Sequence, residues 1–190
     1  SEPLLLQALG AEMRLHWQLD VAHWAVNLDV RQLENALINL CANAREACLA
    51  QGNVTISSVN ERLTAFFPDE GGLPPGDYVA LHVEDDGHGM AAVDIPRAFE
   101  PFFTTKPVGR GSGLGLSMVY GFVGQSGGYA WIESTQGKGT KVSMLFPRCH
   151  EPVPDEVTPA PRPQRMARGE RLLLVDDELN LRAVMREYLT

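Results

Sequence analysis

Apolar and polar positions alternate with two different periods along the chain, and these periods predict its helices and strands. An apolar run from Pro3 to Leu9 is typical of the end of a helix that stops at Gly10. Apolar residues at every second position from Met13 to Leu19 predict a half-buried strand, and the same alternation recurs at 54–59 and 78–83. The last two segments are expected to be antiparallel strands joined by a turn-rich segment.

A long helix is predicted from Asp29 to about residue 50, because Asp29 to Gln32 has a capping-box pattern. Five apolar residues at helical spacing form its buried stripe: Leu33, Leu37, Leu40, Ala44 and Ala47. Three asparagines spaced four apart form a second stripe on its flank: Asn35, Asn39 and Asn43. Asparagine is a poor helix former, so this stripe lowers helix stability unless it serves a ligand. A solvated polar face is the alternative.

The chain is richest in glycine between Glu100 and Gly128. Three glycines at alternate positions stand there: Gly111, Gly113 and Gly115. A helical apolar pattern from Leu116 to Val123 follows directly, and the free N–H groups at the start of a helix favour an anion, most often a phosphate. Lys106 and Arg110 add two cations just before the glycines. A mobile surface loop before a core helix would have the same glycines.

Two further strands, Tyr129–Ser134 and Thr140–Phe146, are predicted to form a hairpin. The resulting order of elements predicts an α/β sandwich with helices on one face of a mixed β-sheet. The segment from Pro147 to Gly169 contains six of the thirteen prolines and is expected to be an extended linker. After it, an apolar strand pattern at 171–175 precedes acidic residues and a helical pattern, which predicts the first piece of a second domain.

Composition and charge exclude several classes of function. The chain has 190 residues, 44% of them hydrophobic, which is ordinary for a soluble globular protein. Its net charge of −8 argues against a nucleic-acid-binding surface, which needs clustered Lys and Arg. No apolar run approaches the roughly 18 residues needed to span a bilayer, and no signal-peptide pattern is present. Three cysteines without a metal-binding spacing indicate reduced thiols and a cytoplasmic location.

Five motifs occur in a fixed order, and together they strongly resemble the catalytic ATP-binding domain of bacterial sensor histidine kinases. They are N-x-x-x-N-A at Asn39 to Ala44, D-x-G-x-G-M assigned to Asp86 to Met90, F-x-P-F-F-T-T-K at Phe99 to Lys106, G-x-G-L-G-L at Gly111 to Leu116, and G-K-G-T at Gly137 to Thr140. The resemblance covers residues 1–148. The amino-acid sequence at 33–40 is similar to that of hybrid kinases, which carry a receiver domain. The sequence at 173–178 resembles the first strand and acidic pocket of such a receiver domain.

This resemblance implies a Bergerat-type ATP-binding fold with ATP and Mg²⁺ as cofactors. It implies that Asn39 ligates Mg²⁺ through its amide oxygen and that Asn43 contacts the phosphates or the nucleoside. Asp86 would accept a hydrogen bond from the adenine amine, Thr140 would reach the same adenine edge, and the glycines of the acidic turn would allow close approach. The full set of expected nucleotide contacts is Asn39, Asn43, Asp86, Gly87, Gly89, Lys106, Arg110, Gly111, Ser112, Gly113, Leu114, Gly115, Leu116 and Thr140.

The implied activity is transfer of the ATP γ-phosphate to a histidine on a separate dimerisation domain, with a receiver domain as a further partner. Related ATPases carry a glutamate as a base for water one turn before the Mg²⁺ asparagine, and Asn35 stands at that position here. An amide cannot take a proton from water at neutral pH, which favours a kinase. The alternatives are a non-catalytic nucleotide-binding docking module and an ATP-hydrolysing clamp.

The resemblance divides the chain into a catalytic domain at 1–148, a linker at 149–169 and a truncated receiver at 170–190. Asp176 and Asp177 would belong to the incomplete metal pocket of that receiver, whose phospho-accepting aspartate would lie beyond Thr190. None of the five histidines has the helical setting of a phospho-acceptor. The chain alone is therefore expected to lack the residue that receives the phosphate.

Overall fold

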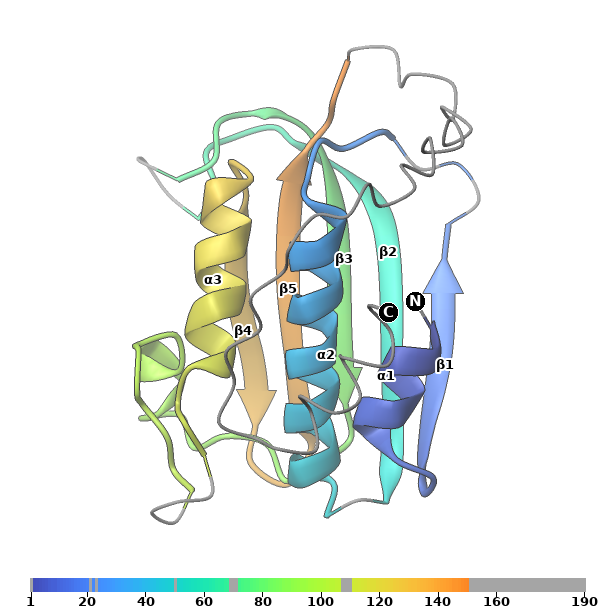
Figure 1. The fold of residues 1–190 in the computed structure, drawn as a ribbon. Coiled ribbons are helices and arrows are strands. Elements are labelled where there is room, and N and C mark those ends of the chain that lie inside the picture. Colours follow the sequence, from blue (N-terminus) through green and yellow to red (C-terminus); the bar gives the residue numbers. More distant parts are fainter. Residues whose placement is uncertain are drawn as a thin grey trace, which may run out of the picture. The chain divides into compact units, whose positions relative to one another are not determined.

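The computed structural model contains one five-stranded sheet with three helices on one of its faces (Figure 1). It describes residues 2–20, 22, 24–49, 51–68, 72–106 and 111–150, all within one compact unit. The helices are α1 (Glu2–Leu9), α2 (Val30–Ala47), the 3₁₀ turn η1 (Ile95–Arg97) and α3 (Gly115–Gln125). The strands are β1 (Met13–Leu19), β2 (Gly52–Leu63), β3 (Gly76–Asp85), β4 (Tyr129–Thr135) and β5 (Gly139–Pro147).

The sheet is mixed, as predicted, and its order is β1-β2-β3-β5-β4. β1 and β2 are parallel because α2 forms the crossover between them, whereas the remaining neighbours are antiparallel. β3 lies beside β5, far from it in sequence, and this register places Asp85 opposite Thr140. The pairing of these two strands therefore brings Asp85 next to Thr140, which the sequence predicts as a site residue.

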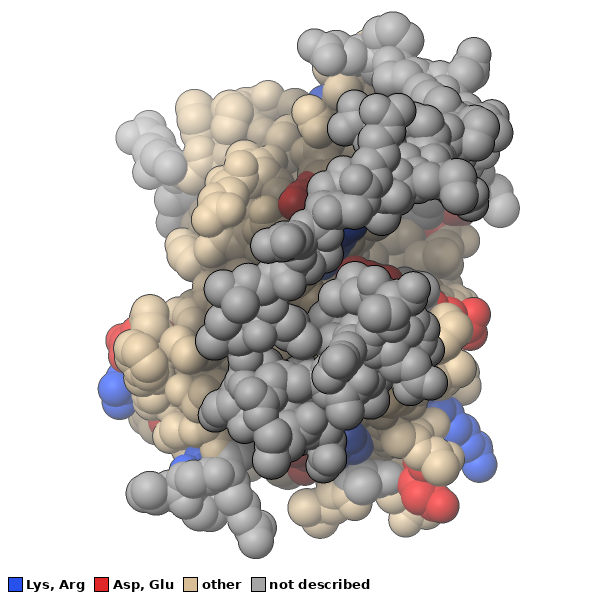
Figure 2. Space-filling view, in the orientation of Figure 1, with Lys and Arg blue, Asp and Glu red and all other residues tan. Residues whose placement is uncertain are grey.

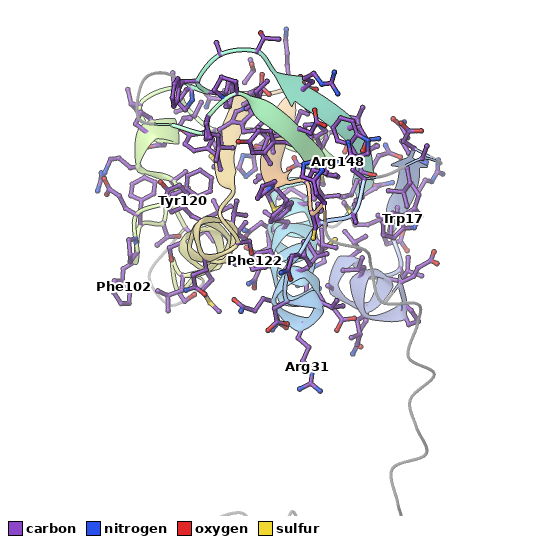
Figure 3. The ribbon with its side chains drawn as sticks, turned by 90° about the horizontal axis from the view of Figure 1, so that it is seen from above. Trp17, Arg31, Phe102, Tyr120, Phe122 and Arg148 are labelled. Carbon is purple, nitrogen blue, oxygen red and sulfur yellow. The ribbon has the colours of Figure 1, made fainter. Side chains whose placement is uncertain are left out.

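Asp29 caps the N-terminus of helix α2, as the capping-box pattern predicted. The Asp29 carboxylate accepts hydrogen bonds from the backbone N–H groups of Arg31 at 2.8 Å and Gln32 at 3.2 Å, which satisfies two of the free donors of the first turn. Four residues of α2 are buried against the sheet: Ala36, Leu40, Cys41 and Ala44. Arg31, on the opposite side of the helix, points away from the fold (Figure 3).

The main hydrophobic core lies between the helices and the sheet. It contains Leu5 and Leu9 of α1, the predicted stripe residues Val119 and Val123 of α3, and the inward positions of the central strands. Each fully buried aliphatic side chain of this kind contributes about 1.5–3 kcal/mol relative to an exposed one. Seen from above, the helices lie below the sheet, with Phe122 on the side of α3 that faces α2 (Figure 3).

A smaller cluster covers part of the other face of the sheet. Tyr78, Ala80 and Leu145 are buried there beneath Phe67 and Trp131, whose ring centroids are 5.1 Å apart. The second face is therefore only partly covered, and the helices all stand on the first. The predicted linker from residue 151 onwards and the predicted receiver segment, with Asp176 and Asp177, lie outside the described residues.

Candidate functional site

The site lies where the end of β3, the last turns of α2 and the start of α3 come together. Gly115, the first residue of α3, faces the amide stripe of α2: a Cβ placed on it would be 3.6 Å from Asn43 Nδ2 and 3.9 Å from Asn39 Cβ. A side chain on residue 115 would therefore project towards these amides. The prediction that the glycine motif and the amide stripe share one site fits this geometry.

Asp85, the last residue of β3, carries a half-buried carboxylate. Its Oδ1 atom accepts a hydrogen bond from the Gly87 N–H at 2.9 Å. Burial raises the pKa of Asp85, and the backbone N–H groups of Gly87 and Thr140 oppose this shift. Because β3 pairs with β5, Asp85 and Thr140 are direct neighbours across the sheet.

Asp86 was predicted to contact adenine, but in the structure its carboxylate is hydrogen-bonded to Asn53. Its two oxygens accept hydrogen bonds from the backbone N–H of Asn53 at 2.8 Å and from Asn53 Nδ2 at 2.7 Å. The side chain and backbone of Asn53 lower the pKa of Asp86, whereas burial followed by the hydrogen bond to Asp86 raises the pKa of Cys48 to about 12. Asp86 therefore ties the start of β2 to the end of β3.

The structure favours Asp85 over Asp86 as the carboxylate available to a ligand. Sequence reasoning missed Asp85, although a signal was present. The motif D-x-G-x-G-M has its acid two residues before the first glycine, and that acid is Asp85, whereas Asp86 is followed directly by Gly87. Strand alternation also selects Asp85, because residues two apart in a strand share a face and Val83 is buried in the main core.

Thr140 belongs to a small buried hydroxyl network beside Asp85. Its Oγ1 is 2.9 Å from Ser134 Oγ, which in turn accepts from the backbone N–H of Met90 at 2.8 Å and donates to the Gly139 carbonyl at 2.9 Å. Only 7% of Thr140 is exposed. The network fixes the Thr140 hydroxyl and attaches the acidic turn to the β4–β5 hairpin.

Gly87 and Gly89 are required by contacts with the protein itself. A Cβ on Gly87 would lie 2.7 Å from the backbone of Ala47 at the end of α2. Gly89 has a φ of 66°, and a Cβ there would lie 2.1 Å from the Thr135 carbonyl oxygen. The turn is therefore wedged between α2 and the β4–β5 hairpin, which holds Asp85 in place.

The amide stripe of α2 lies as the spacing predicted. Asn39 and Asn43 are half-buried, whereas Asn35 is exposed. Asn35 and Asn39 line a cavity of about 70 Å³ between α2 and α3, together with Gln32, Ala36, Met118, Val119 and Phe122. None of these lining residues is acidic.

Lys106 contacts the same helix from the other side of the site. Its ammonium group forms an ion pair with Glu46 and lies 3.5 Å from Asn43 Oδ1. Lys106 is thus brought to the amide stripe, as the phosphate-binding prediction requires. Arg110, the second predicted cation, lies outside the described residues.

The segment before α3 is held by an unusual backbone pair. Gly113 has a φ of 65° and Phe102 a φ of 66°, and the Phe102 N–H donates to the Gly113 carbonyl at 2.9 Å. The left-handed region costs a residue other than glycine of the order of 1–3 kcal/mol, so it persists only where its surroundings enforce it. The Phe102 side chain is 74% exposed and points away from the fold (Figure 3).

The remaining predicted contacts form the start of α3. The Ser112 hydroxyl accepts from the Leu114 N–H at 3.3 Å, and the Ser117 hydroxyl donates to the Leu114 carbonyl at 2.9 Å. A Cβ on Gly111 would lie 2.9 Å from the Lys106 side chain, and Leu116 packs against the main core. Leu116 therefore has a structural place, whereas the backbone of 111–115 is left to line the site.

Residues 28–150 match the family described as the histidine kinase-, DNA gyrase B-, and HSP90-like ATPases. The chain belongs to this family. The chain is 37% identical over 186 residues to the sensor kinase CckA of Brucella abortus, covering 92% of the chain and 19% of CckA. It is 43% identical over 116 residues to the two-component sensor PprA of Pseudomonas aeruginosa, covering 61% of the chain and 12% of PprA. The chain thus spans less than a fifth of these relatives.

Solved structures show the same fold. The mycobacterial sensor histidine kinase MprB has a TM-score of 0.58 at 23% identity, over 77% of this chain and 93% of that one. The catalytic domain of the histidine kinase ThkA also has a TM-score of 0.58 at 23% identity, over 77% and 91%. The predicted α/β sandwich and the predicted resemblance to a sensor-kinase ATP-binding catalytic domain are confirmed. Among the described residues, no helix is long and apolar enough to cross a membrane.

Proposed function

We propose that this domain binds Mg-ATP and transfers the γ-phosphate to a histidine on a separate dimerisation domain of the same kinase. The observation that carries the proposal is the convergence of the half-buried Asp85, the amides of Asn39 and Asn43, and Gly115 at the N-terminus of α3. Membership of an ATPase family makes ATP the nucleotide of the fold. Figure 1 shows α2 and α3 on the same face of the sheet, and Figure 2 is the space-filling view of the molecule from that side.

Adenine is proposed to bind against Asp85 and Thr140. The exocyclic amine of adenine donates hydrogen bonds, and the Asp85 carboxylate is an acceptor that backbone N–H groups of Gly87 and Thr140 already hold at the end of β3. The hydroxyl of Thr140, fixed by Ser134, would lie at the same edge. This replaces Asp86 by Asp85 in the predicted contact and keeps Thr140.

The triphosphate is proposed to lie between α2 and the start of α3. The N-terminus of α3 offers free N–H groups and the positive end of the helix dipole, and Lys106 adds a cation. No group of three His, Cys, Asp or Glu side chains suited to a metal occurs among the residues that the structure describes. Mg²⁺ would therefore be held by the amide oxygen of Asn39, with Asn43 one turn on, and by the phosphates, since a hard cation takes oxygen ligands.

Phosphoryl transfer is mostly positioning and charge neutralisation, and the domain supplies both for ATP. The acceptor would come from another domain, because no described histidine lies on a helix. His16 contacts Asn53, His82 contacts Ser143, and His88 contacts the Gly89 carbonyl. His150 follows β5, and His23 lies outside the described residues.

A kinase is favoured over an ATP-hydrolysing clamp by the cavity between α2 and α3. Asn35 and Asn39 both line it, and none of its described lining residues is an acid that could take a proton from water. Mg²⁺-ATP bound beside Asn39, at the edge of this small cavity, would wait for a nucleophile from another domain. The absence of an acid from this cavity does not separate a kinase from a docking module, and the labelling experiment below separates the two.

We further propose that residues 149–169 are a linker and 170–190 the start of a receiver domain, with Asp176 and Asp177 in its acidic pocket. The match to CckA covers 92% of the chain and so extends well past β5, which supports a shared organisation there. The receiver domain, together with the dimerisation domain, would be the partner of this catalytic domain. A cytoplasmic location stays a prediction.

The decisive experiment mixes the chain with γ-labelled Mg-ATP, alone and with a separately produced dimerisation domain. We expect label on the histidine of the added domain and none on the chain itself. The control uses an added domain whose phospho-accepting histidine is replaced by alanine. Acid-labile label on the chain alone would contradict the proposal, and ATP binding without any transfer would favour the docking module.

A further inference from the structure

Glu46 stands beside the proposed phosphate site without belonging to any of its motifs. It lies in the last turn of α2, three residues after Asn43, and its carboxylate forms an ion pair with Lys106. The Lys106 side chain is 34% exposed and that of Glu46 45% exposed, so the pair lies at the surface of the site and is open to solvent. An anion can therefore replace Glu46 as the partner of Lys106 without disturbing the hydrophobic core.

The ion pair changes the charge that a nucleotide would meet. Lys106 is the described cation that reaches the amide stripe, and its ammonium group lies 3.5 Å from Asn43 Oδ1. Lysine has three N–H donors, and a carboxylate and a phosphate oxygen are similar acceptors for them. While Glu46 holds Lys106, the positive charge at this point is largely neutralised. A phosphate that reaches Asn43 would compete with Glu46 for the same ammonium group.

We propose that Glu46 competes with the nucleotide phosphates for Lys106 and so keeps the affinity for ATP lower than Lys106 alone would make it. This inference rests on the proposed function, because it needs the phosphates to reach Asn43. Exposed ion pairs of this kind contribute little to folding stability. The exchange of one anionic partner for another therefore leaves the fold intact.

A direct alternative is that Glu46 repels the phosphates by its own charge and that Lys106 has no part in the effect. Both ideas give tighter binding when the carboxylate is removed. They differ when Lys106 is removed as well, because competition needs the lysine and direct repulsion does not. A double-mutant cycle separates the two.

The experiment measures Mg-ATP binding by calorimetry for the whole chain and for Glu46→Gln, Lys106→Met and the double variant. We expect Glu46→Gln to bind ATP about three- to tenfold more tightly, since removing a competing charge at this range is worth roughly one decade or less. Lys106→Met should bind more weakly than the unmodified chain. The double variant should match Lys106→Met.

Three outcomes would overturn the inference. The first is unchanged or weaker ATP binding by Glu46→Gln, and the second is an equal gain in ATP affinity when Glu46→Gln is made in the Lys106→Met background. The third is an equal gain in ATP affinity when a distant negative charge is removed. The last is checked with Glu61→Gln, near the far end of β2. Glu46→Ala replaces Glu46→Gln if the latter does not fold. If the unmodified chain binds no ATP at all, the proposed function fails together with this inference, whereas ATP binding with an unaltered Glu46→Gln affinity overturns the inference alone.

Discussion

At the scale of single residues, neighbouring side chains with the same chemistry have different surroundings. Asp85 and Asp86 are adjacent acids, yet burial raises the pKa of Asp85, whereas hydrogen bonds from Asn53 lower that of Asp86. The first has the surroundings of a ligand-binding acid and the second those of a structural one. The two variants below test this division.

Asp85→Asn is expected to weaken ATP binding about tenfold or more. The variant loses the charge that strengthens the hydrogen bond from the adenine amine, a change of about 1–3 kcal/mol. Asp86→Asn is the matched control and should bind ATP nearly normally. GTP should bind far more weakly than ATP to the unmodified chain, because guanine presents an acceptor to Asp85. Calorimetry measures all three, and equal losses in the two Asp variants would remove the distinction.

Asn39→Ala is expected to abolish the enhancement of ATP binding by Mg²⁺ while the fold remains intact. The reason is that an amide oxygen would be lost from a metal that needs oxygen ligands. Titrations with ATP in Mg²⁺ and in a chelator measure the enhancement, and thermal unfolding checks the fold. If only Asn43→Ala abolishes it, the ligand lies one turn further along α2.

At the scale of elements, the site depends on how the start of α3 is held. Gly113 and Phe102 both adopt the left-handed backbone conformation, and one hydrogen bond joins them. This pair sets where the free N–H groups of α3 point. Gly121 and Gly124, further along α3, have no such role, because a Cβ on either would meet nothing within 4 Å.

Gly113→Ala is expected to weaken ATP binding strongly, by about tenfold or more, and to destabilise the fold by the order of 1–3 kcal/mol. Its Cβ would lie 2.4 Å from the Phe102 carbonyl carbon, so the start of α3 must shift. Gly121→Ala, in the middle of α3, should instead stabilise the fold by roughly 0.5–1 kcal/mol without changing ATP binding. Calorimetry and thermal unfolding measure both, and similar effects of the two substitutions would contradict the assigned role.

At the scale of the whole molecule, the described domain is completed just after β5. The Arg148 guanidinium bonds the Asp77 carboxylate at 3.0 Å and lies 4.7 Å from the centroid of the Trp24 ring, and the Cys149 N–H donates to the Ala25 carbonyl at 2.7 Å. These contacts attach the end of the last strand to the segment before α2. They place the last described contacts of the domain at residues 148 and 149.

A chain that ends at residue 150 is therefore expected to fold and to bind ATP with unchanged affinity. A chain that ends at residue 146 should unfold at a lower temperature, because Asp77 and Trp24 lose Arg148. Thermal unfolding and calorimetry on the two truncated chains measure this. A loss of ATP binding on truncation at 150 would show that later residues belong to the catalytic domain and would contradict the proposed boundary.

The sequence by itself determined the elements, the family resemblance and most of the site. Periodicity located the strands, the α3 core residues, and Leu40 and Ala44 of the buried face of α2, because the period of burial is fixed by local backbone geometry. It did not locate Ala36 and Cys41, which are also buried on α2. The family resemblance predicted that Asn39, Asn43 and the glycines before α3 share one site. The D-x-G-x-G-M spacing already begins at Asp85, but the different surroundings of Asp85 and Asp86 were decided by tertiary structure, because they depend on which strands pair and on Asn53. The pairing of Lys106 with Glu46 was likewise decided by tertiary packing, since sixty residues separate them and no local pattern relates them.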